Sequence, residues 1–368
     1  MSDALSTASS LLHSVFGFSE FRPGQEEIVR AVLTGENVLA VMPTGSGKSL
    51  CYQLPAIARP GLTLVVSPLI ALMRDQVRAL AAAGVAAGSL NSSNDPAENA
   101  RVLGLLHRRE LRLLYVAPER LARPDMVEML AESHVTLMAI DEAHCVSQWG
   151  HDFRPEYLTL GSLARQIGGR LQTLALTATA DAPTRGDIVD KLFAAPPRVF
   201  VRSFDRPNLR LAFKPKERSA RQVQAFVAAH QGESGIVYCA SRRKVEELAA
   251  ALVAAGIRAL PYHAGLDKAV RDANQDAFQQ EDGVVMTATV AFGMGIDKPD
   301  VRFVCHADLP ANVEAYYQEI GRAGRDGLAA DTLTLYGMGD MQLRRMQIEQ
   351  AESSDERKRI ERQRLNAL

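Results

Sequence analysis

The chain has 368 residues, of which 47% are hydrophobic and 23% are charged, and its formal net charge is −1. This length predicts about two domains, and either half could bury a full core, so neither a disulfide nor a metal is needed for folding. Because the net charge is near zero, it gives no argument for nucleic-acid binding. Any such site must be a local basic surface on a neutral protein.

The four cysteines, Cys51, Cys145, Cys239 and Cys305, lie far apart and form no C-x-x-C pair. This spacing predicts neither a zinc ribbon nor a disulfide framework, and we interpret them as buried or partly buried free thiols in a reducing compartment. No Lys or Arg precedes Arg22, and no apolar run approaches the ~20 residues of a bilayer span. We therefore expect no signal peptide, no membrane contact and a cytoplasmic, nucleoid-associated protein.

In the first half of the chain, short apolar runs rich in β-branched residues alternate with helical patterns. The expected strands are residues 38–42, 62–67, 111–117, 135–141 and 173–177. The helical stretch 69–83 places its apolar residues mostly on one face. Nearly all-apolar strands separated by helices predict a parallel sheet covered by helices on both faces.

The first expected strand runs into residues 43–49 (PTGSGKS), which precede a helical pattern. Glycines let backbone N–H groups approach phosphate oxygens, and the helix N-terminus adds positive potential. Lys48 would hold the β- and γ-phosphates, and the Ser49 hydroxyl would bind Mg²⁺. Met42 stands where the strict pattern has glycine, but the flanking strand and helix favour a phosphate loop over a plain surface turn. The expected phosphate-binding residues are Thr44, Gly45, Ser46, Gly47, Lys48 and Ser49.

An acidic pair follows another expected strand, where residues 135–140 lead into Asp141 and Glu142, and then Ala143 and His144. Asp141 would coordinate Mg²⁺ through water, and Glu142 could polarise the attacking water. Two adjacent acids at a strand end more often cap a helix. Together with a phosphate loop, the same pair indicates a catalytic site.

The alternation breaks at residues 202–208, which contain Arg206 and Pro207, and we place the domain boundary there. The predicted lobes are residues 1–205 and 206–340. The second repeats the pattern, with strands expected at 235–240, 258–262, 284–289, 301–306 and 332–336 and a helix at 242–255. The predicted fold class is therefore α/β, with two tandem lobes that each contain a parallel sheet flanked by helices.

The second lobe has no phosphate loop but contains residues 318–325 (QEIGRAGR), which we expect on a helix. There, Arg322 and Arg325 would share one face and reach a nucleotide bound to the other lobe. Arginine across a cleft stabilises charge on the transferred phosphoryl group and makes hydrolysis depend on lobe closure. A basic surface helix paired with Glu319 would explain the charges but not the glycines. The candidate catalytic residues are Lys48, Asp141, Glu142, Gln318, Arg322 and Arg325.

From residue 341 the chain changes character. Residues 353–356 (SSDE) predict a helix start, with Ser353 and Glu356 spaced as a capping box. Residues 357–368 predict a charged helix. We expect residues 341–368 to form a helical extension that leads into a further region.

Three longer strings resemble the RecQ family of DNA helicases, in helicase superfamily 2. They are FGF and FRPGQ within residues 16–25, DEAH followed by CVSQWGHDFRP within 141–155, and AFGMGIDKP at 291–299. The strings occur in family order, and the resemblance runs from about Leu11 to Met346. It implies two RecA-like lobes with ATP and DNA at the interlobe cleft. It also implies ATP-driven movement 3′→5′ on single-stranded DNA, with Mg²⁺, to separate duplexes in repair and recombination.

The resemblance also implies roles for individual residues near the nucleotide. Gln25 would hydrogen-bond the adenine edge while Phe18 and Arg22 sandwich its ring. Trp149 and Phe153, in the aromatic-rich loop 145–155, would couple DNA arrival to the ATP site. The polar neighbours of Trp149 favour an exposed loop over a core anchor, and an exposed aromatic offers a stacking surface for bases.

Similar helicases grip the sugar-phosphate backbone with polar groups from both lobes. By resemblance, Thr177 and Thr179 would relay between ATP and DNA, and His144 would be a coupling group. Such contacts carry no sequence code, so binding should be weakly sequence-specific and salt-sensitive. His263 and His306 are expected to be structural. The remaining candidate contacts are Ser67, Arg120, Arg154, Ser241, Arg242, Thr287 and Thr289.

RecQ proteins commonly continue into a four-cysteine zinc module and a winged-helix domain. Here all four cysteines lie inside the expected motor and the sequence stops at Leu368, so we expect neither in this chain. We therefore expect no zinc, a monomeric motor on single-stranded and partly duplex DNA, and poor unwinding by this chain alone. Single-strand-binding or repair proteins are further expected partners. Two alternatives stay open: an RNA helicase of the same superfamily, and a nucleotide-dependent DNA-binding scaffold without motor work. Stronger ATPase stimulation by RNA would favour the first, and negligible DNA-stimulated turnover the second.

Overall fold

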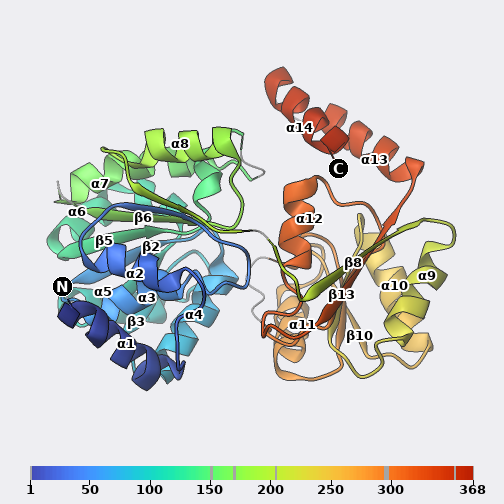
Figure 1. Cartoon of the computed structure of the whole chain (residues 1–368), viewed down its shortest axis with the longest axis horizontal. Helices are drawn as coiled ribbons and strands as arrows, with labels where there is room; N and C mark the ends of the chain where they lie inside the picture. Colours follow the sequence, from blue (N-terminus) through green and yellow to red (C-terminus); the bar gives the residue numbers. More distant parts are fainter. Residues whose placement is uncertain are drawn as a thin grey trace. The chain divides into compact units, whose positions relative to one another are not determined.

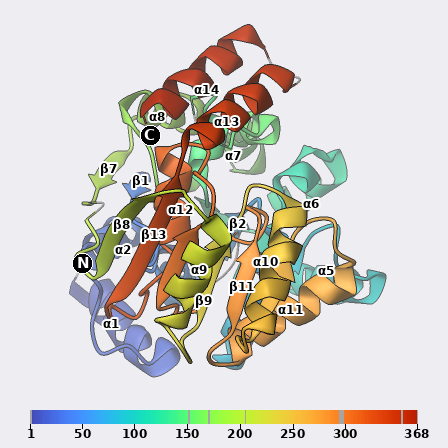
Figure 2. The ribbon, with the colours of Figure 1, turned by 90° about the vertical axis from the view of Figure 1, so that its right-hand side faces the viewer.

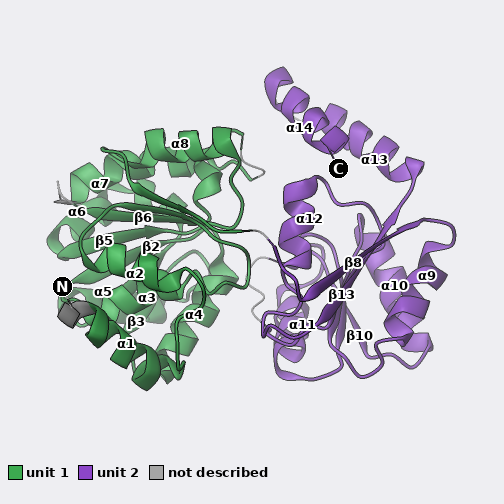
Figure 3. Ribbon diagram, viewed as in Figure 1, with its two compact units in different colours: residues 1–204 green, residues 205–368 purple. Residues whose placement is uncertain are grey.

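The computed structural model describes residues 2–149, 152–168, 171–203, 205–293, 298–351 and 354–367. It consists of two compact units, residues 1–204 (unit 1) and 205–368 (unit 2), shown in Figures 1 and 3. Each unit is an α/β assembly with its own parallel sheet and its own core. The division falls at Asp205, next to Arg206 and Pro207.

The described part of unit 1 contains a seven-stranded, all-parallel sheet in the order β3-β4-β2-β5-β6-β1-β7. All five strands that the sequence predicts are present, and β3 and β7 are additional. Gly88 and Ser89 weaken the apolar signal of β3, and β7 is an edge strand exposed on both faces except at Phe200. The strands are β1 (Val38–Val41), β2 (Leu62–Val66), β3 (Ala87–Leu90), β4 (Leu113–Val116), β5 (Val135–Ile140), β6 (Gln172–Thr177) and β7 (Arg198–Val201).

Helices cover both faces of this sheet. One apolar core joins the sheet to α2, α3 and α4, and a second joins the opposite face to α5, α6, α7 and α8. Helix α1 packs on the outer side of α2 and α3 through Leu12. The helices are α1 (Ser2–Phe16), α2 (Gln25–Leu33), α3 (Leu50–Ala58), α4 (Ile70–Ala82), α5 (Pro96–His107), α6 (Pro124–Glu132), α7 (Leu160–Gly168) and α8 (Ala182–Leu192), with 3₁₀ turns η1 (Pro118–Ala122), η2 (Ala143–Val146) and η3 (Pro155–Thr159).

Unit 2 repeats this plan over its described residues with a six-stranded, all-parallel sheet in the order β10-β11-β9-β12-β13-β8. The sequence predicts every strand except β8, an edge strand whose Leu211 and Phe213 are exposed. Helices α9 and α10 cover one face, and α11 and α12 the other. The elements are β8 (Leu209–Pro215), α9 (Ser219–Ala228), β9 (Gly235–Tyr238), α10 (Arg242–Ala254), β10 (Ala259–Tyr262), α11 (Lys268–Gln280), β11 (Val285–Ala288), β12 (Phe303–His306), α12 (Val313–Ile320) and β13 (Ala330–Tyr336).

Two helices, α13 (Met338–Gln350) and α14 (Asp355–Ala367), lie side by side after the last strand (Figure 2). The predicted charged helix is thus confirmed as α14. The predicted capping residue Ser353 lies outside the described residues. The hydroxyl of Ser354 accepts the Arg357 N–H at 3.3 Å, so the serine next to the predicted one has this role.

Two composition-based expectations can be compared with the structure. All four cysteines are buried free thiols, as predicted, and burial raises the pKa of Cys51 to about 12. A thiol with so high a pKa is unreactive at neutral pH. Within the described ranges, no helix has both the length and the apolar character that a bilayer crossing requires.

Parallel pairing determines where functional groups can gather. Because every strand of a unit runs in one direction, all of its strands end at the same edge of the sheet. In open α/β sheets, ligands bind at this carboxyl edge. In unit 1 the residues that follow β1, β2, β5 and β6 include the phosphate loop, Ser67, the acidic pair and Thr179.

Candidate active site

The phosphate loop connects β1 to α3 at the carboxyl edge of the unit 1 sheet. Gly45 and Gly47 have φ values of +82° and +76°, which glycine adopts without strain. The Ser46 hydroxyl donates to the Pro43 carbonyl at 2.7 Å, and the Lys48 ammonium lies 3.4 Å from the Met42 carbonyl oxygen. The loop thus folds around the start of α3, where backbone N–H groups lack intrahelical partners and can bind an anion.

Gln25, the first residue of α2, supports this loop. It is only 2% exposed. Its Oε1 accepts the Arg22 N–H at 2.9 Å, and its Nε2 donates to the Ser46 and Gly47 carbonyls, both at 3.0 Å. The positive φ of Gly47 favours glycine, and a β-carbon there would also lie 2.5 Å from Gln25 Nε2. Adenine reading by Gln25 stays a prediction, and the structure adds a role in shaping the phosphate loop.

Phe18 and Arg22, the predicted adenine sandwich, lie just before Gln25. Phe18 is 49% exposed. Arg22 is also exposed, and its guanidinium donates to the Gly45 carbonyl. Both side chains are therefore accessible, and Arg22 contacts the phosphate loop; their roles at adenine stay predictions.

The acidic pair follows β5. Glu142 has a φ of +48°, in the left-handed region that non-glycine residues rarely adopt. Such strained residues cluster at active sites. Burial raises the pKa of the Asp141 carboxyl to about 7; the Glu142 carboxylate acts in the same direction and the Lys48 ammonium opposes it. The phosphate-loop lysine is thus electrostatically linked to the acidic pair.

The donor set fits Mg²⁺. The Asp141 carboxylate is buried, and Glu142 Oε2 is buried without a hydrogen-bond donor. A bound cation would stabilise the charged form of such carboxylates. Mg²⁺ is usually bound by one or two carboxylates together with substrate phosphates and waters. Ser49, which precedes the first residue of α3, stays the predicted hydroxyl ligand.

His144 connects the acidic pair to β6. Its Nδ1 lies 2.9 Å from Thr177 Oγ1 and 3.4 Å from Glu142 Oε2. The Thr177 hydroxyl donates to the Thr179 carbonyl at 3.0 Å. Because that donation uses the only hydroxyl proton, the ring must donate from Nδ1. The predicted relay residues therefore form one hydrogen-bonded chain.

The aromatic-rich loop begins at η2 in the same unit. Trp149 is 39% exposed, which confirms the prediction of an exposed loop over a core anchor. Its N–H donates to Ser147 Oγ at 3.1 Å, and Ser147 donates to Asp187 on α8 at 2.7 Å. Gly150 and His151, in the middle of the loop, lie outside the described residues.

The end of this loop is also fixed. The Arg154 N–H donates to the Cys145 carbonyl at 2.9 Å, and its guanidinium forms an ion pair with Asp152 at 3.1 Å. Phe153 is half-buried. The Tyr157 hydroxyl donates to the Asp141 carbonyl at 3.0 Å. The 3₁₀ turn η3 that follows the loop is thus bonded to the strand end that carries the acidic pair, a tyrosine contact that no sequence motif indicated.

The other predicted DNA contacts of unit 1 lie at the same edge of the sheet. Ser67 follows β2 and is buried, and its hydroxyl accepts the Leu69 N–H at 3.4 Å. Arg120, in η1 after β4, donates to the Asn91 carbonyl at 3.2 Å. Their roles in DNA binding stay predictions.

The predicted contacts of unit 2 differ in accessibility. Ser241 and Arg242 are exposed at the start of α10, where the Ser241 hydroxyl accepts the Lys244 N–H at 3.3 Å. Thr289, after β11, is half-buried. Thr287 is 0% exposed, and its hydroxyl lies 3.2 Å from the Val245 carbonyl oxygen. As in unit 1, the DNA-binding roles of these four residues stay predictions.

The arginine motif does not form the continuous helix that the sequence predicts. Helix α12 ends at Ile320, and Gly324 has a φ of +57° and donates its N–H to the Val301 carbonyl at 2.9 Å. The glycines thus redirect the backbone, and residues 321–325 form a turn. Arg322 is 9% exposed, Arg325 is half-buried, and Gln318 lies half-buried on α12. Residues 294–297, in the neighbouring predicted string, lie outside the described residues.

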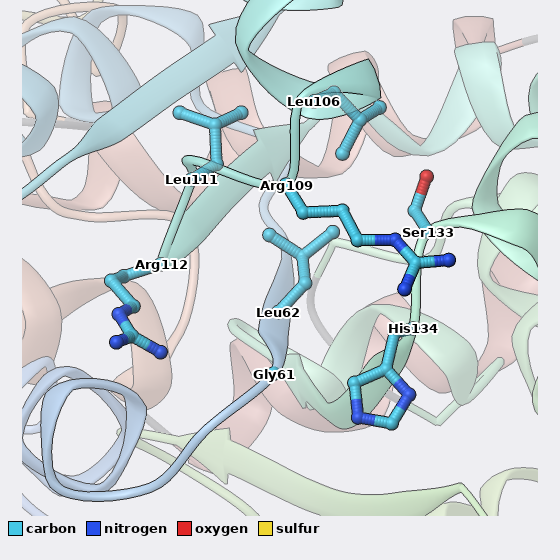
Figure 4. Close-up of a pocket in the computed structure, with 8 residues that line it drawn as sticks. All are labelled: Gly61, Leu62, Leu106, Arg109, Leu111, Arg112, Ser133 and His134. Atoms are coloured by element: carbon cyan, nitrogen blue, oxygen red, sulfur yellow. The ribbon is translucent and has the colours of Figure 1, made fainter.

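A separate pocket of about 180 Å³ opens in unit 1 where β2, β4 and β5 begin. Figure 4 shows the Arg109 side chain extending toward Ser133, with His134 below it. The pocket is therefore at the edge of the sheet opposite the phosphate loop and is not part of the candidate active site. Its lining residues are Gly61, Leu62, Leu106, Arg109, Leu111, Arg112, Ser133 and His134.

Comparisons with known proteins identify the chain as a helicase. The family model of the DEAD/DEAH box helicases matches residues 22–187, and that of the helicase conserved C-terminal domain matches residues 218–327. Mycobacterium smegmatis helicase Lhr bound to ssDNA and AMP-PNP has a TM-score of 0.69 at 23% identity, over 94% of this chain and 49% of that one. S. cerevisiae Dbp5 bound to RNA and ADP BeF3 has a TM-score of 0.71 at 16% identity, over 99% of both chains. These similarities show the fold, the tandem RecA-like lobes of superfamily 2 helicases.

Proteins of similar sequence identify the family within this class. ATP-dependent DNA helicase RecQ of Haemophilus influenzae is 47% identical over 98% of this chain and 58% of its own length. Its namesake in Bacillus subtilis is 42% identical, over 96% and 60%. The probable ATP-dependent DNA helicase RecS of Bacillus subtilis is 42% identical over 93% of this chain and 69% of its own. The chain belongs to the RecQ family of DNA helicases, and it spans about three-fifths of the length of the RecQ proteins above.

Proposed function

We propose that this chain is the motor of a RecQ-type DNA helicase, which hydrolyses ATP to move 3′→5′ along single-stranded DNA and separate duplexes. One observation carries the proposal: His144 is hydrogen-bonded to Thr177 and lies 3.4 Å from Glu142 Oε2, a chain of contacts at the sheet edge that also carries the phosphate loop. Such a chain gives nucleotide hydrolysis a physical link to a second site. The DNA-helicase names of the similar sequences support the choice of DNA.

The nucleotide chemistry is assigned to unit 1. Lys48 and the N–H groups at the start of α3 would bind the phosphates, with Ser49 and Asp141 holding Mg²⁺. Mg²⁺, when bound, neutralises charge on the phosphate oxygens. Glu142 would orient and polarise the attacking water, since its buried Oε2 has no hydrogen-bond donor.

The arginine-bearing turn of unit 2 is assigned to the transferred phosphoryl group. Arg322 and Arg325 would supply positive charge that stabilises its transition state, with Gln318 beside them on α12. Guanidinium groups suit this task because they stay charged and can donate two hydrogen bonds to phosphate oxygens.

DNA is assigned to backbone contacts and to the aromatic-rich loop. Ser67, Arg120, Ser241, Arg242 and Thr289 would hold the sugar-phosphate backbone without reading sequence. Trp149 would stack on a base and report its arrival through the loop to Asp141. In a cell, the proposed partners are single-stranded and partly duplex DNA during repair and recombination. The motor would act there, at the nucleoid, as a monomer.

Two measurements on the purified chain test this function. We expect ATPase stimulation by single-stranded DNA to exceed stimulation by RNA of equal length and sequence. We also expect faster displacement of streptavidin from a 5′ biotin than from a 3′ biotin, because movement is 3′→5′. Stronger stimulation by RNA would make the chain an RNA motor. ATP hydrolysis without displacement at either end would remove the motor function.

A further inference from the structure

The turn at residues 321–325 is held mainly by side chains from the start of unit 2. Because α12 ends at Ile320, the carbonyl groups that follow it lack intrahelical partners. The Arg206 guanidinium supplies the missing donors. Its Nη2 donates to the Ala323 and Gly324 carbonyls at 2.8 and 2.9 Å, and its Nη1 to the Gly321 carbonyl at 3.4 Å. One side chain therefore bonds three carbonyls of the turn.

Asn208 completes the clamp. Its Nδ2 donates to the Gly324 and Leu328 carbonyls, both at 2.9 Å, and its Oδ1 accepts from Arg206 Nε at 3.3 Å. Pro207 lies between the two clamping residues, and its ring fixes the backbone that connects them. We name Arg206 and Asn208 the turn clamp. Their separation from the turn by more than 100 residues shows that the clamp is a tertiary contact.

The other end of the turn is fixed from the sheet. The Nε2 atom of His306, at the end of β12, is 2.8 Å from Oε2 of Glu319. The Arg322 N–H donates to the Glu319 carbonyl at 3.3 Å. The Arg322 guanidinium lies so close to Gly293 that a β-carbon there would be 2.8 Å from Nη2. The turn is therefore bonded to Glu319 and packed against Gly293, and the clamp bonds its carbonyl groups.

We propose that Arg206, together with Asn208, is a positioning residue for ATP hydrolysis that holds the turn in the conformation that aims Arg322 and Arg325. The inference rests on the proposed function, since it requires these two arginines to act on the phosphoryl group. Arg206 acts through the turn and not on the nucleotide. A misplacement of about 1 Å in a catalytic group can cost roughly 10²-fold in rate, so the clamp affects turnover more than binding.

The decisive variants are Arg206→Lys, which keeps the charge, and Asn208→Ala. A lysine ammonium is a single point donor and cannot span three carbonyls as the planar guanidinium does. With saturating single-stranded DNA, we expect Arg206→Lys to lower kcat by about 10–100-fold while KM for ATP changes less than about twofold. Asn208→Ala should lower kcat in the same way by a smaller factor. Hydrogen exchange at residues 321–328 should accelerate in both.

A double-variant comparison separates positioning from general weakening. If Arg206 acts only through the turn, adding Arg206→Lys to Arg325→Ala should lower kcat by clearly less than the product of the two single losses, because only Arg322 is then left to misplace. A full multiplicative loss would contradict the inference. So would a normal kcat for Arg206→Lys, or a loss of ATP affinity equal to the loss of kcat.

Arg59→Lys is the matched control. Arg59, in unit 1, donates to the Val32 backbone carbonyl and to the Gln172 side-chain Oε1, both at 2.9 Å, so its guanidinium also bonds two acceptors at once. Its replacement should lower the melting temperature without lowering kcat. The proposed function fails separately, if the unmodified chain shows no DNA-stimulated ATPase. An active unmodified chain with an inactive Lys48→Ala and a fully active Arg206→Lys would overturn only the clamp.

Discussion

The Ser147 hydroxyl donates to Asp187 Oδ2 at 2.7 Å and accepts the Trp149 N–H at 3.1 Å. Asp187 lies on α8 and also pairs with Lys191 at 2.8 Å. One serine therefore joins the aromatic-rich loop to a helix that packs on the sheet, which fixes the backbone of Trp149 while its ring stays exposed.

Removing this anchor should weaken the response to DNA. We expect Asp187→Ala to reduce stimulation of the ATPase by single-stranded DNA about 5–20-fold, because a misplaced loop loses productive geometry, with a smaller effect on the rate without DNA. Steady-state assays across a DNA titration measure both rates. The control is Asp190→Ala, an exposed position on the same helix. Equal loss of basal and stimulated rates in Asp187→Ala would show that the anchor merely stabilises unit 1.

Gln25 should affect ATP binding through the phosphate loop as well as through the base. Gln25→Glu keeps the acceptor for the Arg22 N–H but places a carboxylate oxygen against the Ser46 and Gly47 carbonyls. We therefore expect Gln25→Glu to raise KM for ATP more than Gln25→Ala does, by about tenfold or more. A tenfold change corresponds to about 1.4 kcal/mol of binding free energy.

The two roles of Gln25 can be separated with GTP. Gln25→Ala should also blur the preference for ATP over GTP, as base reading predicts. A raised KM for both nucleotides with unchanged selectivity would assign Gln25 to the loop alone. An unchanged KM in both variants would contradict both roles.

The His144–Thr177 bond should matter for stability and for turnover. Thr177→Val preserves shape but removes the hydroxyl that contacts the His144 ring. An unsatisfied buried donor costs about 1–3 kcal/mol, so thermal or urea unfolding should show a loss of this size. A loss of stability does not by itself lower kcat while the variant stays folded, so we also expect a lower DNA-stimulated kcat at temperatures where Thr177→Val is folded. Full stimulation in a destabilised but folded Thr177→Val would remove the relay.

Salt dependence tests the backbone contacts of unit 2. Arg242 is exposed at the start of α10, whereas its neighbour Arg243 is engaged in an ion pair with Glu247 at 2.6 Å. For single strands the slope of log K against log salt changes by about 0.7 per phosphate contact. Arg242→Ala should reduce the slope by about this amount, and Arg243→Ala should leave it unchanged. Equal slopes for Arg242→Ala and the unmodified chain would exclude this contact.

The central strands and the phosphate loop were predictable because their signals are local. A strand buried on both faces is mostly apolar: β1 is apolar throughout, β2 is apolar except at Thr63, and β5 and β6 are apolar over residues 137–140 and 174–176. The edge strands β7 and β8 are partly exposed, so their mixed sequences carry no such signal. The end of α12 was mispredicted because apolar and charged spacing continues through the arginines, whereas the helix ends at Ile320 and the positive φ of Gly324 turns the backbone away.

The contacts that support the site could not be read from the sequence. Asp187 lies 40 residues from Ser147, and Arg206 lies 117 residues from Ala323. Nothing in the local pattern of either residue indicates its partner, since only the folded sheet brings them together. Arg206 and Pro207 were visible in the sequence as an interruption, and the structure adds what the arginine binds.

The central claim is that Lys48 and the acidic pair form one ATP-hydrolysing site that DNA stimulates. Glu142→Gln tests it most directly, by comparing Mg²⁺-dependent ATP binding with turnover on single-stranded DNA. Loss of one water-positioning or electrostatic group typically costs about 10²–10³-fold in kcat. We predict a loss of this size in Glu142→Gln with ATP binding retained, and neither binding nor turnover in Lys48→Ala. Near-normal DNA-stimulated turnover in either variant would contradict the account.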